Sequence, residues 1–386
     1  MSSILETKLD SSAGSGAVRM HLVGDLMLAG KISEMAVKSG PEWACSALRD
    51  TFSSAALLCG NLELPFSRAG VASTTSSRNE FKCGPELAEV LKHGPWSLLT
   101  LANNHCMDWG DEGLSTTGNL LRQLDIATVG AGTNSYEARQ PVVLEREGIS
   151  FGFLAYAKPG NWSAHDRSAG AARLEQKDIV ADVSRLKDTV DHVIVALHWG
   201  VEYCPYPAPE AVELAHAVCD AGARVIVGHH PHTLQGVEIY NGTLIAYSLG
   251  NFVTDTSLDI APKKEAWQQS HWSGVLQVDF DHDRIVSHDF LPVIIDEDMH
   301  TRPATADEAE TIRLHIATLS EENALDGSLY YNNAVANIWQ REVKAVWRRL
   351  RLHGLKGLWE VIRTVKIRHF KMLFGALRND RHKGDN

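Results

Sequence analysis

The chain has 386 residues, of which 44% are hydrophobic and 22% are charged. These shares are close to those of ordinary globular proteins, so they exclude a disordered polymer, a collagen-like fibre and a small disulfide scaffold. The formal net charge is −11, and residues 341–386 hold 13 Lys and Arg against 4 Asp and Glu, so the preceding body is strongly acidic and is not expected to bind nucleic acid.

Residues 1–17 are rich in Ser and Gly and are expected to form a disordered leader. They contain Glu6 and Asp10 and lack the basic and apolar regions of a signal peptide. No stretch reaches the ~18 apolar residues that cross a membrane. The six cysteines are irregularly spaced, without a Cys-x-x-Cys pair, which is typical of reduced thiols. We therefore expect a cytoplasmic protein, and a peripheral position at the inner membrane face is left open.

Several apolar runs are followed directly by side chains that can bind a metal or move a proton. Residues 18–23 alternate apolar and polar side chains and lead into Gly24-Asp25. The pattern recurs at 55–59, 97–101, 193–197 and 225–227, which lead to Glu63, to Asn104 with His105, to His198, and to His230 with His232. Helical patterns at 86–92, 112–124 and 209–221 lie between these runs. This alternation predicts a layered α/β fold.

The later segments predict a different arrangement of secondary structure. Residues 237–240, 243–248, 275–280 and 285–295 are apolar runs joined by turns such as Asn241-Gly242, which predicts consecutive antiparallel strands. From about residue 305 the pattern becomes helical. We place the main domain at 18–300, a helical extension at 301–340 and a basic tail at 341–386.

The basic tail has the pattern of two amphipathic helices. Val343, Val346, Trp347 and Leu350 recur at helical spacing, a second apolar set follows from Leu358 to Val365, and Gly354 to Gly357 separates the two. Such helices can pack on their own domain or on a partner subunit. They can also lie on a membrane surface, since Trp, Phe and basic residues are placed as such an anchor requires.

The polar strand ends are expected to lie together, because the carboxyl ends of parallel strands meet at one edge of a sheet. Carboxylate, carboxamide and imidazole donors together suit Mn, Fe, Co or catalytic Zn better than Mg or Ca. The strongest element is Gly228-His229-His230-Pro231-His232. Since Pro231 favours an extended backbone at His230, we expect His230 and His232 to share a face and His229 to point elsewhere.

The same segments match a known family. GDLML (24–28), NLE (61–63), LANNHCMDWG (101–110), HWGVEY (198–203), GHHPHTLQG (228–236) and LIAYSLGNF (244–252) stand in family order. This series resembles the CapA-like, poly-gamma-glutamate branch of the calcineurin-like metallophosphatase superfamily. The resemblance covers roughly residues 18–255. It implies a four-layer α/β/β/α sandwich, two sheets flanked by helices, with a metal centre at one edge.

The resemblance also implies residue roles. One or two divalent ions, Mn, Fe or Zn, would be held by Asp25 in the first site, Glu63 as the bridging carboxylate, and Asn104, His198, His230 and His232. His105 would be the general acid that protonates the leaving group, and Asp108 would orient it. Water activated between two cations becomes a nucleophile near neutral pH, which agrees with this assignment.

Two departures from the phosphatase pattern bear on the first metal site. Met27 stands where those enzymes usually have His, and a thioether is a poor ligand for such cations. Glu63 stands where they usually have Asp. A mononuclear centre is therefore as open as a dinuclear one. Glu202 could orient a ligand histidine or be a solvated loop acid. Asn251 could line the site, but a turn role is the one we expect.

The function predicted from these residues is metal-dependent hydrolysis of a phosphoester or a related anionic linkage. The alternative is an accessory protein of poly-gamma-glutamate or capsular polymer biosynthesis that acts on, or binds, an amide-linked acidic polymer. A third class is a non-catalytic scaffold on the membrane. The expected partners are an anionic small-molecule or polymer substrate and, through the tail, a membrane surface.

Overall fold

The structure is a computed structural model that describes residues 6–8, 17–67, 83–255, 269–322 and 327–334. The amphipathic helices predicted at 341–386 lie outside the described residues. Within the predicted leader, residues 6–8 form strand β1 (Glu6–Lys8), which pairs antiparallel with strand β16 (Ile285–Ile295). The expectation of a leader without structure is therefore wrong at these three residues, because the edge of β16 offers backbone groups that a further strand can satisfy.

The larger sheet has the order β1-β16-β15-β2-β3-β4-β5, with β14 paired to β2 and β17 paired to β16. Its other strands are β15 (Trp272–Phe280), β2 (Val18–Leu26), β3 (Leu57–Leu62), β4 (Trp96–Thr100), β5 (Ala127–Val129), β14 (Asn251–Val253) and β17 (Thr301–Pro303). Strands β2 to β5 and β14 run parallel, and β15 pairs antiparallel with both β2 and β16. The carboxyl ends of β2, β3 and β4 therefore meet at one edge.

The second sheet has the order β12-β13-β11-β10-β8-β7. Its strands are β12 (Val237–Tyr240), β13 (Thr243–Ala246), β11 (Val225–His229), β10 (His192–His198), β8 (Ile149–Ala157) and β7 (Val142–Arg146). The four central strands are parallel and the two edge strands antiparallel. A short pair, β6 (Ala131–Gly132) with β9 (Gly170–Ala171), lies apart. The antiparallel portions predicted at 237–248 and 275–295 are confirmed.

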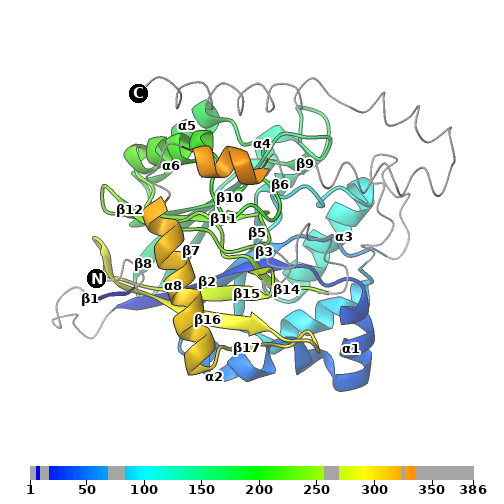
Figure 1. The fold of residues 1–386 in the computed structure, drawn as a ribbon. Helices are drawn as coiled ribbons and strands as arrows, with labels where there is room; N and C mark the ends of the chain where they lie inside the picture. The colour runs from blue at the N-terminus through cyan, green and yellow to red at the C-terminus, as the bar shows by residue number, and fades with distance from the viewer. Residues whose placement is uncertain (1–5, 9–16, 68–82, 256–268, 323–326, 335–386) are drawn as a thin grey trace, which may run out of the picture.

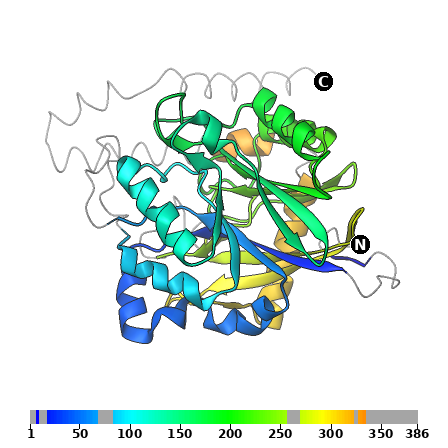
Figure 2. The ribbon, with the colours of Figure 1, turned by 180° about the vertical axis from the view of Figure 1, so that it is seen from behind.

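Helices cover the outer faces of both sheets (Figures 1 and 2). On the first sheet lie α1 (Lys31–Ser39), α2 (Arg49–Ser53) and the 3₁₀ helices η1 (Pro41–Leu48) and η2 (Pro85–His93). On the second lie α5 (Gln176–Leu186) and α6 (Pro209–Ala221). Further helices are α3 (Gly110–Gln123), α4 (Ser135–Ala138) and α8 (Ala306–Glu322), which contacts β16 and β12, and residues 328–334 are helical as well. The predicted four-layer α/β/β/α sandwich is confirmed.

The core follows from the period of two along the buried strands. In β10, Ile194 and Ala196 join the cluster between the two sheets, whereas Val193, Val195 and Leu197 join the cluster under α5 and α6. Both faces of the strand are covered, so it is apolar almost throughout. The only polar residues of β10 are therefore at its ends, and the last of them is His198.

The helical pattern at 86–92 is confirmed as part of η2, which is a 3₁₀ helix. One local prediction needs correction. The extension predicted from residue 301 begins as strand β17 before α8 starts at residue 306. The β7–β8 hairpin was not predicted, although Glu147 and Gly148 both have positive φ (49° and 80°) as a tight hairpin turn requires.

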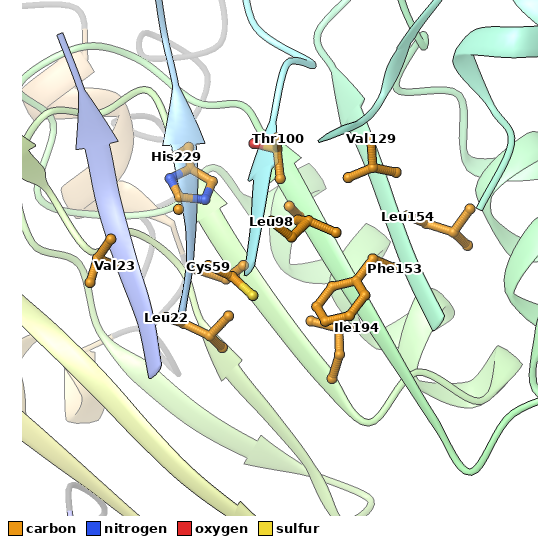
Figure 3. Close-up of a pocket in the computed structure, with 13 residues that line it drawn as sticks. Leu22, Val23, Cys59, Leu98, Thr100, Val129, Phe153, Leu154, Ile194 and His229 are labelled. Atoms are coloured by element: carbon orange, nitrogen blue, oxygen red, sulfur yellow. The ribbon is translucent and has the colours of Figure 1, made fainter. Parts of the chain in front are cut away.

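A small cavity lies between the two sheets (Figure 3). Its walls are mainly apolar, with Leu98 from the first sheet and Phe153 from the second, and Thr100 and His229 line the end nearest the carboxyl edges of the strands. Its volume is about 10 Å³, which is room for roughly one water molecule. It is too small for a substrate, so the chemistry must take place at the sheet edge above it.

Candidate metal centre

The polar residues at the strand ends are deeply buried. Asp25 is near the end of β2 and Glu63 directly follows β3, and both carboxylates are 0% exposed. His198 ends β10, and His230 and His232 follow β11. Because β2 lies in one sheet and β10 and β11 in the other, the site forms where the carboxyl edges of the two sheets meet. The structure thus brings together five of the six predicted ligands.

These side chains form two groups that share one carboxylate. Glu63, His198 and His230 form one group, and Asp25, Glu63 and His232 form the other. Within each group the potential ligand atoms lie within 4.8 Å of one another. Glu63 Oε1 is 3.6 Å from His198 Nε2 and 3.7 Å from His232 Nε2, so it stands between the groups. This is the position that the sequence predicts for a bridging carboxylate.

The bonding state of these atoms fits a metal ion. Among the described residues, neither carboxylate oxygen of Glu63 and no Nδ1 atom of His198 or His230 has a hydrogen-bond partner. A buried polar atom without a partner is costly, and a buried carboxylate especially so. A divalent cation would satisfy these atoms, and the mixed O and N donor set suits Mn, Fe or Zn. The residues present therefore fit the expected cofactor.

The sixth predicted ligand, Asn104, lies against the group of Glu63, His198 and His230. Its Oδ1 atom is 2.6 Å from His198 Nε2, and its side chain is half-buried. Asn104 and His198 were predicted as ligands of the same ion, and the structure places their side chains in contact.

A hydrogen-bond network fixes the carboxylate of Asp25. Asn61 Nδ2 donates to Asp25 Oδ1 (2.8 Å), and the backbone N–H of His230 donates to Asp25 Oδ2 (3.1 Å). Asn61 is itself fixed, because its Oδ1 accepts from Thr100 Oγ1 (2.9 Å) and Asn103 Nδ2 (3.2 Å). Asn61 and Asn103 belong to the NLE and LANNHCMDWG motifs, but the sequence alone predicted no role for them. Partners of this kind orient ligands and raise metal affinity.

The conformation of the His229–His232 segment differs from the prediction. His230 has φ of 93° and His232 has φ of 56°, so neither is extended. His229 does not point away from the site, since its Nδ1 is 3.1 Å from Asp25 Oδ1. The reason is that β11 ends at His229, and the turn after it reverses the faces that the period of two assigned. All three imidazoles therefore border the centre.

His105 and Asp108 form a pair beside the centre. His105 Nδ1 lies 2.8 Å from Asp108 Oδ2, and the two side chains are only 12% and 13% exposed. The backbone N–H of His105 donates to Asn103 Oδ1 (3.1 Å), which ties the pair to the network behind Asp25. This geometry suits an imidazole oriented by a carboxylate. The role of His105 as general acid stays a prediction.

Met27 does not prevent the group of Asp25, Glu63 and His232 from forming. Its backbone N–H donates to Val253 O (2.7 Å), and its side chain packs against the core, with the sulfur 3.9 Å from Thr254 Oγ1. Asp25, Glu63 and His232 supply three donors without it. The described side chains therefore form two candidate groups of donors that share Glu63, and one ion or two stays a prediction.

Asn251 lines the metal centre and contacts His232, although a turn role was expected for it. Its Oδ1 is 2.9 Å from His232 Nδ1, and the residue is 3% exposed. Strand β14 pairs in parallel with β2 so that Asn251 lies opposite Asp25. Because a carbonyl oxygen accepts only from a protonated nitrogen, this contact keeps the proton on Nδ1 and leaves Nε2 to face Glu63. Asn251 belongs to the LGNF motif, but only the pairing of β14 with β2 shows that its side chain contacts His232.

Without a metal, burial and mutual charge set the protonation of the centre. Burial opposes ionisation of Asp25, yet the contacts of His229 and His232 hold its pKa well below the usual value. Burial and the charge of Asp25 raise the pKa of Glu63 well above its usual value. Burial lowers the pKa of His230 to about 3, whereas for His232 the nearby carboxylates outweigh burial and raise the pKa to about 10. A cation that binds here must therefore displace protons from Glu63 and His232.

Within the part of the chain that the structure describes, no helix has both the length and the apolar content of a membrane span.

Comparison with known proteins supplies the family. Residues 19–256 match the profile of a family described as bacterial capsule synthesis protein PGA_cap. The PGA biosynthesis protein CapA of Bacillus subtilis is 28% identical over 275 residues, 70% of each chain. The capsule biosynthesis protein CapA of Bacillus anthracis is 28% identical over 286 residues, 72% of this chain and 67% of that one. A crystal structure of a novel phosphatase of Mycoplasma pneumoniae is 15% identical with a TM-score of 0.44, over 72% of this chain and 94% of that one.

Proposed function

The chain belongs to the bacterial capsule synthesis protein family, and on this premise we propose that it is a metal-dependent hydrolase whose centre activates water to cleave a phosphoester or a related anionic linkage. The resemblance to the CapA-like branch predicted from the sequence is confirmed by the match over residues 19–256. One observation carries the proposal: Glu63 is 0% exposed, and neither of its oxygens has a hydrogen-bond partner among the described residues. Two groups of donors converge on that carboxylate.

The ligands divide between two places. Asp25 and His232 would hold one ion, His198 and His230 with Asn104 would hold a second, and Glu63 would bridge them. Divalent ions held there lower the pKa of a coordinated water and neutralise charge that develops on the substrate. The protein's own part is to orient the ligand side chains, through the hydrogen bonds of Asn61, Asn103 and Asn251.

Proton delivery falls to His105. Asp108 accepts a hydrogen bond from Nδ1–H and orients the ring, so the proton on Nε2 is the one that His105 can give to the leaving group. The pair is largely shielded from solvent, which favours transfer to the substrate over exchange with water.

A second candidate function differs in the linkage that the centre acts on. The two Bacillus relatives are named for PGA and capsule biosynthesis, which favours an accessory protein of such a pathway that acts on, or binds, an amide-linked acidic polymer. The same centre could attack an amide carbonyl, because the activated water and the proton donor serve both reactions. A cytoplasmic location and membrane contact through residues 341–386 are further parts of the proposal, and flotation of the full chain with anionic liposomes tests the contact.

The test is elemental analysis of the purified full chain, paired with hydrolysis of an aryl phosphodiester and monoester in the presence of Mn, Zn or Fe. We expect stoichiometric metal, turnover that disappears in His105→Ala, and metal content that His105→Ala leaves intact. The matched ligand variants His230→Ala and Asn104→Ala should lose metal. Full metal content in both ligand variants would refute the assignment, and bound metal without ester hydrolysis would favour the amide-linked polymer or a scaffold.

A further inference from the structure

His229 ends β11 of the second sheet, and its ring reaches a residue of the first sheet. Its Nδ1 atom lies 3.1 Å from Oδ1 of Asp25, near the end of β2, which is a hydrogen-bonding distance. Strands β2 and β11 contact each other where the two sheets meet. Both side chains are buried, at 2% and 0% exposure. The contact is therefore a direct link between the two sheets at the metal centre.

The backbone that carries the His229 ring is held from two sides. Its carbonyl accepts from the backbone N–H of Trp199 (3.1 Å). The indole Nε1 of Trp199 donates to Tyr247 O (3.0 Å). Both atoms press on Gly228, where a Cβ atom would lie 2.7 Å from that nitrogen and 1.8 Å from that oxygen. Because residue 228 has no side chain, β11 fits against them, and the ring of His229 extends from a fixed backbone.

The two carboxylate oxygens of Asp25 have different surroundings. Oδ1 is 2.8 Å from Asn61 Nδ2 and 3.1 Å from His229 Nδ1, so two side-chain nitrogens face it. Oδ2 accepts from the backbone N–H of His230 (3.1 Å) and lies 3.4 Å from Nδ1 of His232, which belongs to the same ligand group as Asp25. His229 is in neither group of ligands formed by the described side chains. Its place is therefore on the oxygen that Asn61 also holds.

The space around the ring leaves little room for another donor. His229 and Thr100 line one end of the cavity between the sheets, whose other walls are mainly apolar (Figure 3). The volume of about 10 Å³ holds roughly one water molecule. Thr100 Oγ1 already donates to Asn61 Oδ1 (2.9 Å). A side chain without a donor at position 229 would therefore leave Oδ1 of Asp25 with one donor fewer in a buried setting, where the loss costs more than in water.

We propose that His229 is a positioning residue, which fixes Asp25 through Oδ1 and so presents Oδ2 to an ion held by Asp25, Glu63 and His232. Nδ1 then carries the hydrogen, because only an N–H group can donate to a carboxylate. Partners of this kind typically change the affinity of a ligand set for its metal by about 10- to 100-fold. This inference rests on the metal centre of the proposed hydrolase.

The effect should be confined to one group of ligands. Asp25 belongs to the group that contains His232 and not to the group that contains His198 and His230. Loss of the His229 donor should therefore weaken the Mn ion that needs Asp25 and spare an ion held by the other group.

The test is calorimetric Mn titration of the full chain, with urea unfolding of each metal-free protein to measure stability. His229→Leu keeps the apolar bulk and removes the donor, so the affinity for one Mn ion should fall by about 10- to 100-fold. His229→Asn places an amide N–H close to the position of Nδ1 and should recover most of the affinity. His229→Gln carries its amide one bond further out and should not recover it, and this variant replaces His229→Leu where the latter fails to fold.

A double-mutant cycle shows whether His229 acts through Asp25. Asp25→Asn should itself weaken Mn binding, and His229→Leu added to it should lower the affinity no further. The matched control is His192→Leu, which removes a buried imidazole (1% exposed) from β10, at the end opposite His198. It loses the contact of Nε2 with Asp281 O (2.5 Å), so stability should fall while the Mn affinity stays at the wild-type value.

Wild-type Mn affinity in folded His229→Leu or His229→Gln protein would overturn the inference, and so would an equal loss of affinity in the Asp25→Asn background. Weak binding in His229→Asn as well as in His229→Leu would indicate that His229 is itself a ligand and would overturn it too. Each of these results leaves the proposed hydrolase standing, because the wild-type chain still binds Mn. Absence of Mn binding by the wild-type chain would overturn both.

Discussion

Replacing Gly24 with alanine should disturb the metal centre through the backbone alone. Gly24 directly precedes Asp25 in β2, and a Cβ atom built on it would lie 2.0 Å from Gly250 O and 3.1 Å from Leu249 O. Ordinary contact needs ~3.5 Å, so the two segments must separate by about 1.5 Å. The hydrogen bond from Asp25 N–H to Gly250 O, now 3.0 Å, would be lost. Asp25 would then move away from Asn251, which lies opposite it on β14.

The expected loss of stability follows from the overlap of the new Cβ atom and from the lost hydrogen bond. Overpacking of this kind costs roughly 1–3 kcal/mol, and the lost hydrogen bond adds about 1 kcal/mol. We therefore expect Gly24→Ala to lower the free energy of unfolding by about 2–4 kcal/mol, measured by urea unfolding of the metal-free protein. Mn affinity, measured by calorimetric titration, should fall by about 10- to 100-fold, because Asp25 loses its alignment.

Gly118 supplies the matched control. It lies inside α3, and a Cβ atom there meets nothing within 4 Å. Gly118→Ala should therefore raise the free energy of unfolding by roughly 0.5–1 kcal/mol and leave Mn affinity unchanged. A Gly24→Ala protein that unfolds at the wild-type urea concentration and binds Mn with wild-type affinity would refute the reasoning.

Three further predictions follow from single side chains. Glu63→Gln should reduce bound metal below one ion per chain by elemental analysis, because both ligand groups share this carboxylate; retention of two ions would contradict the bridge. Asn251→Ala should weaken Mn binding by about 10- to 100-fold with little change in unfolding, since it frees the ring of His232; equal affinity would exclude the orienting role. His21 is buried and accepts from Gln277, and burial, then Arg19, lowers its pKa to about 4 from 6.5. The unfolded chain therefore binds a proton that the folded one excludes, so the stability that neutral His21 contributes is complete above pH 6.5 and is lost as the pH falls to 4. Allowing for partial solvation, wild type should lose about 2 kcal/mol more than His21→Gln over this window in urea unfolding, and parallel curves would show that His21 does not titrate there.

Much of the fold was predictable because the signal is local. Buried strands such as β10 must be apolar along most of their length, so the apolar run at 193–197 identifies the strand and the polar residue that ends it. Parallel strands carry their carboxyl ends to one edge, so Asp25, Glu63 and His198 could be assigned to one site before any contact was known. The family resemblance then supplied the bridging position of Glu63, where the structure finds the two ligand groups joined.

Other features depended on contacts between distant segments. Asn251 looks like a turn residue in its own sequence, and it orients His232 only because β14 pairs with β2. His229 contacts Asp25 only because two separate sheets meet at this edge. The helical pattern at 86–92 predicted a helix but did not specify its 3₁₀ form, since a segment of nine residues has similar periodicity in both helix types until packing selects one.

The sequence by itself therefore determined which residues end the strands and which chemistry they can support, because strand burial and side-chain period act over a few neighbouring residues. The tertiary structure decided which of these residues touch. Strand register, the turn that gives His230 a positive φ and the meeting of two sheets are set by packing over the whole chain, and no local pattern records them.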